Sequence, residues 1–126
     1  MPKPRFLIID DEHEILTMFS RALELDGYET ATATSAEAAI ELINEAPPDA
    51  IMLDLNMPYV NGLGLLYRLR ERHPEIAVTI VTGLSNLDET MRSEIRALKA
   101  ELRFKPLRIA EIQTIARELL ARRHQA

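Results

Sequence analysis

Short apolar runs alternate with helical patterns along the chain, and this alternation limits the possible folds more than any other feature. Five runs have the length and composition of buried or half-buried strands, namely 5–9, 28–33, 50–53, 76–81 and 101–104. Each run precedes a segment with apolar residues at helical spacing, at about 12–26, 34–45, 62–73, 85–100 and 108–123. Strands and helices that alternate through short connections form a parallel sheet covered by helices on both faces. The sequence therefore predicts an α/β fold, and its 126 residues predict one domain.

Local signals mark two of the helix ends. Gly27 follows the first helical pattern, where a left-handed residue closes a helix. Thr34 begins the motif TSAE, which has a glutamate three residues on. This capping-box pattern predicts that the Thr34 side chain caps the second helix.

Charge and composition exclude several classes of protein. The net charge of −5 argues against a general binder of nucleic-acid backbones. The chain has no Cys, so disulfides, thiolate catalysis and cysteine zinc sites are excluded. Its N-terminal apolar run is too short for a signal peptide, and no run approaches the roughly 20 apolar residues of a membrane span. We expect a soluble, cytoplasmic protein.

Polar residues follow four of the five predicted strands. Strand 5–9 is followed by Asp10 and Asp11, and strand 50–53 by Asp54. The fourth strand is followed by Thr82 and Gly83, and the fifth by Lys105 and Pro106. The carboxyl ends of parallel strands share one edge of the sheet, where open α/β sheets bind ligands. These side chains are therefore expected to meet.

Each of these residues also has a purely structural interpretation. Asp11 suits a helix cap and Asp54 suits an Asx-turn, and each alternative is about as good as a functional one. Thr82 suits a β-strand. Lys105 with its proline suits a solvated loop. The combination at four separate strand ends favours a functional site over four unrelated structural roles.

The chemistry of this set suits phosphoryl transfer. Converging carboxylates repel one another unless a cation lies among them, and Mg²⁺ prefers oxygen ligands. Asp54 can then act as a nucleophile towards phosphorus. Lys105 can supply a positive charge and Thr82 a hydrogen bond to the phosphoryl oxygens, while Gly83 allows close approach of backbone N–H groups.

Four segments together resemble the receiver domain of two-component response regulators, the CheY-like family. They are IIDDE at 8–12, LDLNMPYVNGLGLL at 53–66, IVTG at 80–83 and FKP at 104–106. The resemblance covers essentially the whole chain. It implies one receiver domain over 1–126, with a doubly wound, flavodoxin-like (βα)5 sheet of five parallel strands in the order 2-1-3-4-5.

The resemblance also implies a role for each matching residue. Asp54 corresponds to the phosphoacceptor, Thr82 to the switch hydroxyl, and Lys105 to the family's lysine, with a cis bond to its proline. The implied Mg²⁺ ligands are Asp10, Asp11, Asp54 and the backbone carbonyl of Asn56, with Asp11 more direct than Asp10. Met57-Pro58 and Gly62 match the loop that shapes the site.

The implied partners are a sensor histidine kinase or a histidine phosphotransfer protein that donates from phosphohistidine. The implied activity is that of a phosphorylated switch, which has only self-phosphorylation and slow autodephosphorylation. Its output surface, and a homodimer interface, would lie on the predicted elements at 85–100, 101–104 and 108–123.

The sequence departs from the family pattern at two places. Receivers often carry Tyr or Phe three residues before the lysine, where this chain has Leu102. The nearest aromatic, Phe104, is expected to face the other side of the strand and so not to replace it. The usual Gly-Ala turn before the fifth strand is also absent, and ALKAEL stands at 97–102.

Two other functions remain open from sequence. A haloacid-dehalogenase-type phosphatase also uses a strand-end Asp with Mg²⁺, Thr or Ser and Lys, but it typically has a second acid where this chain has Asn56. A receiver-fold module that is never phosphorylated is the other alternative, and the complete acidic set argues against it. The output domain, the cognate kinase and the oligomeric state are left open.

Overall fold

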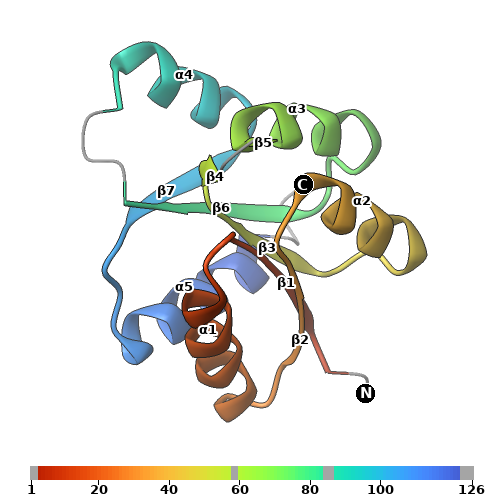
Figure 1. Ribbon diagram of the computed structural model, residues 1–126, viewed down its shortest axis with the longest axis vertical. Coiled ribbons are helices and arrows are strands. Elements are labelled where there is room, and N and C mark those ends of the chain that lie inside the picture. Colours follow the sequence, from red (N-terminus) through yellow and green to blue (C-terminus); the bar gives the residue numbers. More distant parts are fainter. Residues whose placement is uncertain (1–2, 58–59, 84–86, 123–126) are drawn as a thin grey trace.

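The computed structural model describes residues 3–57, 60–83 and 87–122. Its main sheet has five parallel strands: β1 (Arg5–Ile9), β2 (Glu29–Ala33), β3 (Ala50–Leu53), β6 (Ala77–Thr82) and β7 (Ala100–Phe104). Their order is β2-β1-β3-β6-β7 (Figure 1). Since β6 and β7 are the fourth and fifth strands of this sheet, the predicted α/β class and the order 2-1-3-4-5 are confirmed.

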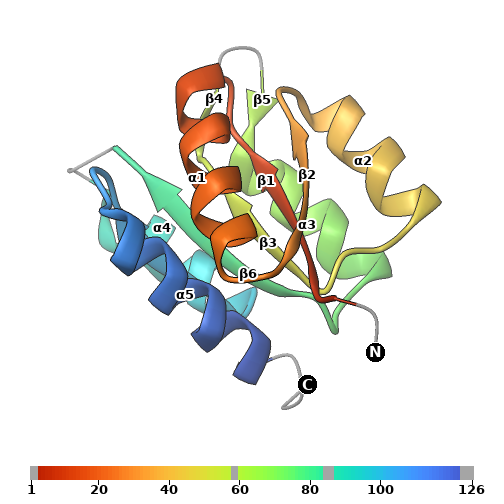
Figure 2. The ribbon, with the colours of Figure 1, turned by 90° about the horizontal axis from the view of Figure 1, so that it is seen from below.

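Five helices cover the two faces of the sheet: α1 (His13–Leu25), α2 (Ala36–Glu45), α3 (Gly62–Arg72), α4 (Glu89–Ala97) and α5 (Ile109–Arg122). The helices α1 and α5 lie on one face, and α2, α3 and α4 on the other (Figure 2). Most predicted boundaries are within one or two residues. The fourth helix is the exception, because α4 begins at Glu89, after its N-cap Asp88, and ends at Ala97, whereas 85–100 was predicted. Positions 85 and 86 lie outside the described residues.

The core consists of two apolar layers separated by the sheet. Along β1, Leu7 and Ile9 contribute to the layer beneath α2, α3 and α4, while Phe6 and Ile8 contribute to the layer beneath α1 and α5. All four side chains are at most 2% exposed. A strand that is buried on both faces cannot show apolar–polar alternation, which explains why the central strands are continuous apolar runs.

One of the two predicted helix ends has the expected geometry. Gly27 has φ +86°, in the left-handed region, as predicted. The cap assigned to Thr34 is wrong: α2 begins one residue later, and the Ser35 hydroxyl accepts the Ala38 N–H at 3.2 Å. Two hydroxyl residues stand side by side here, and only the one next to the first helical residue reaches the free N–H groups.

The missing Gly-Ala turn between α4 and β7 is replaced by a turn at Lys99, which has φ +58°. Arg70 of α3 holds this turn, because its Nε donates to the Leu98 carbonyl at 2.7 Å and its Nη2 to the Lys99 carbonyl at 3.3 Å. Its Nη1 also donates to the Ile76 carbonyl at 2.6 Å. One guanidinium thus joins the end of α3, the start of β6 and the turn before β7, and stabilises a left-handed residue that is not glycine.

The sequence did not predict a short antiparallel hairpin between β3 and α3. Its strands are β4 (Asn56–Met57) and β5 (Val60–Asn61), with Asn56 opposite Asn61 and Met57 opposite Val60. Two-residue strands are too short for a periodic signal. In the part of the chain that the structure describes, no helix is both long and apolar enough to cross a membrane.

Candidate functional site

The strand-end residues predicted to meet lie along one edge of the main sheet, at the carboxyl ends of β1, β3, β6 and β7. Backbone hydrogen bonds continue one residue past the strands, and they hold the backbone of the residues that carry the site's side chains. The Asp54 N–H donates to the Ile9 carbonyl at 2.9 Å, and the Lys105 N–H donates to the Thr82 carbonyl at 2.8 Å. Asp10 is held in the same way, by its N–H on the Ala33 carbonyl at 3.1 Å.

Lys105 connects the acids of two strands. Its Nζ lies 2.7 Å from Asp10 Oδ2 and 3.5 Å from Asp54 Oδ2. The Asp10 and Asp54 side chains are each only 4% exposed, and the Lys105 side chain is 14% exposed. Two buried carboxylates on neighbouring strands repel each other, and the ammonium between them offsets that repulsion.

The electrostatic environment favours the charged form of Lys105. Burial lowers the pKa of Lys105, but its hydrogen bond to Asp10 and the charges of Asp54, Asp10 and Glu12 together raise it above its ordinary value. The group is therefore a permanent cation at neutral pH. It can stabilise negative charge that develops next to Asp54.

A compact group of three acids stands beside this ion pair. One carboxylate oxygen from each of Asp10, Asp11 and Glu12 lies within 4.8 Å of the others. Asp10 is buried, Asp11 is partly exposed and Glu12 is exposed, so the group opens towards solvent. Sequence reasoning assigned no role to Glu12, although the run DDE was the available signal.

The structural interpretation of Asp11 as a helix cap is wrong. Glu12 occupies the N-cap position of α1, and no side chain caps this helix end. Instead, the Glu12 N–H donates to Asp10 Oδ1 at 3.0 Å. Asp10 therefore uses one oxygen to hold the entry to α1 and the other to bind Lys105, which fixes its carboxylate in one orientation.

Two predicted members of the site lie at the short hairpin, because Asn56 is its first residue and Gly62 directly follows it. Asn56 pairs with Asn61 across β4 and β5, just after Asp54 and Leu55. Pro58 of the predicted Met57-Pro58 loop lies outside the described residues. Gly62 is the first residue of α3, and it packs directly against the backbone that carries Asp54.

A methyl group at Gly62 would meet that backbone, 2.7 Å from both the Asp54 carbonyl oxygen and the Leu55 Cα. We expect Gly62→Ala to lower the free energy of unfolding by about 1–3 kcal/mol, the range for overpacked sites, since the clash outweighs the roughly 1 kcal/mol of better helix propensity. Urea denaturation measures the change. Gly83→Ala is the control, because nothing lies within 4 Å of its added Cβ; equal stability of the two variants would contradict the expectation.

Thr82 is the last residue of β6, and Gly83 follows it. Thr82 is fully buried and pairs with Phe104 of β7, while Gly83 is exposed with open space around it. The Lys105–Pro106 peptide bond is cis, as the resemblance implied.

The expected orientation of Phe104 is wrong. Residues two apart in a strand share a face, and Leu102 and Phe104 both lie on the α4 side of β7. Leu102 packs into the layer beneath α2, α3 and α4, and the guanidinium carbon of Arg92 of α4 lies 5.5 Å from the centre of the Phe104 ring.

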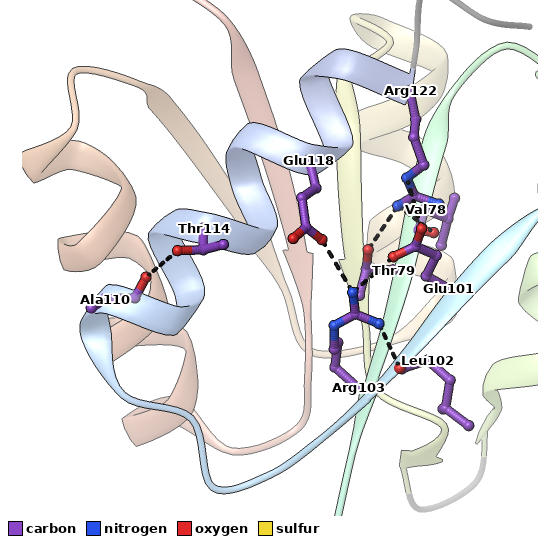
Figure 3. Close-up of polar contacts among 9 residues, drawn as sticks. All are labelled: Val78, Thr79, Glu101, Leu102, Arg103, Ala110, Thr114, Glu118 and Arg122. Atoms are coloured by element: carbon purple, nitrogen blue, oxygen red, sulfur yellow. Dashed lines mark hydrogen bonds and ion pairs between the residues drawn. The ribbon is translucent and has the colours of Figure 1, made fainter.

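The opposite side of β7 carries charge. Arg103 forms ion pairs with Glu101 of the same strand and with Glu118 of α5, each at 3.1 Å (Figure 3). Arg122 Nη2 donates to the Thr79 hydroxyl at 2.9 Å. Figure 3 shows Leu102 directed away from this network. The two faces of β7 therefore have different chemistry, with an apolar and aromatic side towards α4 and an ion-paired side towards α5.

Comparison with known proteins identifies the architecture. The family model described as the response regulator receiver domain matches residues 6–117 of this chain. The chain belongs to the response regulator receiver family. A receiver is a signalling module of two-component systems rather than an ordinary enzyme, and the family implies a histidine kinase as partner.

Several receivers illustrate the similarity. The chain is 30% identical over 121 residues to sporulation initiation phosphotransferase F of Bacillus subtilis, covering 95% of this chain and 96% of that protein. It is 33% identical over 120 residues to the transcriptional regulatory protein PrrA of Mycobacterium tuberculosis, covering 95% of this chain but 51% of that protein. The chain thus spans about half the length of some of its curated relatives.

Solved structures show the same fold. The receiver domain of NtrX from Brucella abortus superposes with a TM-score of 0.83 at 32% identity, covering 92% of this chain and 98% of that one. A CheY-like receiver from Methanospirillum hungatei gives a TM-score of 0.89 at 24% identity, covering 98% of both chains.

Proposed function

We propose that this receiver accepts a phosphoryl group on Asp54 from a phosphohistidine of a sensor histidine kinase or a histidine phosphotransfer protein. The observation that carries the proposal is the position of Lys105 Nζ between the buried carboxylates of Asp10 and Asp54. A cation built into a buried acidic site is suited to a reaction that brings further negative charge to it.

The transfer is a displacement at phosphorus. An Asp54 carboxylate oxygen forms the new P–O bond, and the P–N bond to the donor histidine breaks, with its electron pair leaving on the imidazole nitrogen. Lys105 neutralises charge on the phosphoryl oxygens. Thr82 donates a hydrogen bond to one of these oxygens, and backbone N–H groups at Gly83 approach another.

The acids fit a Mg²⁺ ion. Three carboxylates within 4.8 Å are oxygen ligands of the type that Mg²⁺ prefers, and their mutual repulsion favours a cation. Asp10, Asp11, Asp54 and the Asn56 carbonyl would hold the ion, with Glu12 at the solvent side. When bound, Mg²⁺ supplies further stabilisation of charge on the transferring group.

Asp11 gives the experiment for this proposal. With acetyl phosphate and Mg²⁺, the wild-type chain should form an adduct that is retained on the protein, measured by intact-mass spectrometry. Asp11→Ala should lose Mg²⁺-dependent labelling, and its amide shifts at residues 10–13 should no longer respond to Mg²⁺, because an oxygen ligand is gone. Glu14→Ala removes an exposed acid three residues further on, in the first turn of α1, and serves as the control.

The outcomes separate the alternatives. A dehalogenase-type phosphatase would turn the donor over continually without a retained adduct, and a module that is never phosphorylated would not label. Asp11→Ala labelling as well as the wild type would show that the metal ligands are wrongly assigned.

The remaining assignments belong to the same proposal. Residues 1–126 form one receiver domain, with the output surface, and a homodimer interface, on α4, β7 and α5. The apolar and charged faces of β7 support this surface. The domain has no direct nucleic-acid contact, and its cytoplasmic location stays a prediction.

A further inference from the structure

The aromatic residue of β7 that contacts α4 is Phe104, and it stands directly before Lys105 and not three residues before it, where receivers often carry an aromatic. Phe104 is paired with Thr82 in the sheet, and the next residue, Lys105, donates its N–H to the Thr82 carbonyl. The Phe104 backbone is therefore held beside the backbone of Thr82, and it directly precedes Lys105. Its ring is 38% exposed and extends towards α4.

Arg92 of α4 meets this ring and also reaches the segment before its own helix. Its guanidinium carbon lies 5.5 Å from the Phe104 ring centre, within the range of a cation–π contact. Its Nε donates to the Leu87 carbonyl at 3.3 Å, five residues earlier. One guanidinium thus connects the start of α4 with the tip of β7.

The rest of α4 buries little surface, so the contacts of Arg92 can influence the position of the helix. Ile95 is the one buried residue of α4. The other side-chain contacts of α4 include the exposed hydrogen bond from Tyr67 to Glu94, and the ion pair between Arg96 and Glu89 within the helix. A helix with so little buried surface can change position for a small free-energy difference.

We propose that Arg92 is a positioning residue that couples the phosphorylation site to α4 through the Phe104 ring. This inference rests on the proposed function, because the phosphoryl group on Asp54 is what moves Thr82. Movement of Thr82 displaces its strand partner Phe104, and Arg92 carries that displacement to the start of α4. Leu102 has no aromatic ring with which to do this.

Beryllofluoride with Mg²⁺ is the probe, and the amide shifts of residues 89–97 are the measurement. We expect Arg92→Met and Phe104→Leu to lose most of the α4 response, while amides at Asp54 and Lys105 still respond. The ratio of the two α4 arrangements should change by about two- to fivefold, as expected for a partly exposed cation–π contact. Phe104→Trp should keep the response, because Trp has an aromatic ring; a response kept by Trp and lost with Leu separates coupling from simple packing.

Arg96→Met is the matched control, since Arg96 is on the same helix but pairs with Glu89. An Arg92→Met response equal to that of Arg96→Met would overturn the coupling. A wild-type chain without any response at Asp54 would instead contradict the proposed function. In that case Thr82→Val tests the coupling without a phosphoryl analogue. In the wild-type background, Thr82→Val should shift the α4 amides, whereas in the Arg92→Met background it should not. Equal shifts in both backgrounds would overturn the coupling.

Discussion

Replacing Asp54 with Asn should reduce labelling by acetyl phosphate to background, a loss of at least about 1,000-fold, as is found when a nucleophile is removed. An amide of the same shape keeps the backbone bond to Ile9 but has no nucleophilic carboxylate. The fold should persist, because the lost ion pair to Lys105 is offset by the removal of repulsion between Asp54 and Asp10. Mass spectrometry of the intact chain and its peptides measures both the amount and the position of the adduct.

The matched control is Asp88→Asn. Asp88 Oδ1 accepts the Met91 N–H at 2.8 Å as the N-cap of α4, a role that Asn fills equally well. This variant should label like the wild type. An adduct on Asp10 or on a histidine, or undiminished labelling of Asp54→Asn, would show that Asp54 is not the acceptor.

The fold was predictable because its signals are local and repeated. Each strand run and each helical pattern could be recognised separately, and a parallel sheet was the arrangement that satisfied all ten. The meeting of the strand-end residues followed from the same rule, since parallel strands end at one edge. Asp10, Asp54 and Lys105 are 44 or more positions apart in sequence, and this rule predicts them as neighbours.

What the sequence did not predict depends on tertiary contacts or on geometry finer than a pattern. The left-handed turn at Lys99 is held by Arg70 from another helix, and nothing in the segment ALKAEL indicates it. The hairpin β4–β5 is too short for periodicity. Asp10 rather than Asp11 holds the start of α1, because the cap of this helix is replaced by a bond from the strand end. The orientation of Phe104 is a different case, because alternation along a strand already places Leu102 and Phe104 on the same face.

Lys105→Met should lower the free energy of unfolding by about 3 kcal/mol at pH 7, because it leaves two buried carboxylates without their shared cation. Methionine keeps the length and apolar stem of the side chain, so the change isolates the charge. Acetyl phosphate labelling should also fall, by a factor on the order of 100 to 1,000, as for the loss of one donor to a developing anion. Urea denaturation and the labelling rate measure the two effects.

The pH dependence of this loss follows from the direction of the pKa shift. The pKa of Lys105 in the folded chain is raised above its ordinary value, since its contacts with the carboxylates outweigh its burial. Its contribution to stability is therefore complete below the unfolded pKa of about 10.5, and is lost as the pH rises through the higher folded value. The stability difference between wild type and Lys105→Met should be constant from pH 7 to about 10 and shrink above that.

Lys3→Met separates this effect from a general loss of positive charge. Lys3 is exposed and lies at the other end of β1, so its replacement should change stability by less than about 0.5 kcal/mol. Labelling should stay at the wild-type rate. If Lys105→Met were as stable as Lys3→Met at neutral pH, the acids of β1 and β3 would not need the ammonium. A stability difference that grew above pH 10.5 would likewise contradict the raised pKa, and with it the assignment of Lys105 as the cation that holds Asp10 and Asp54 together.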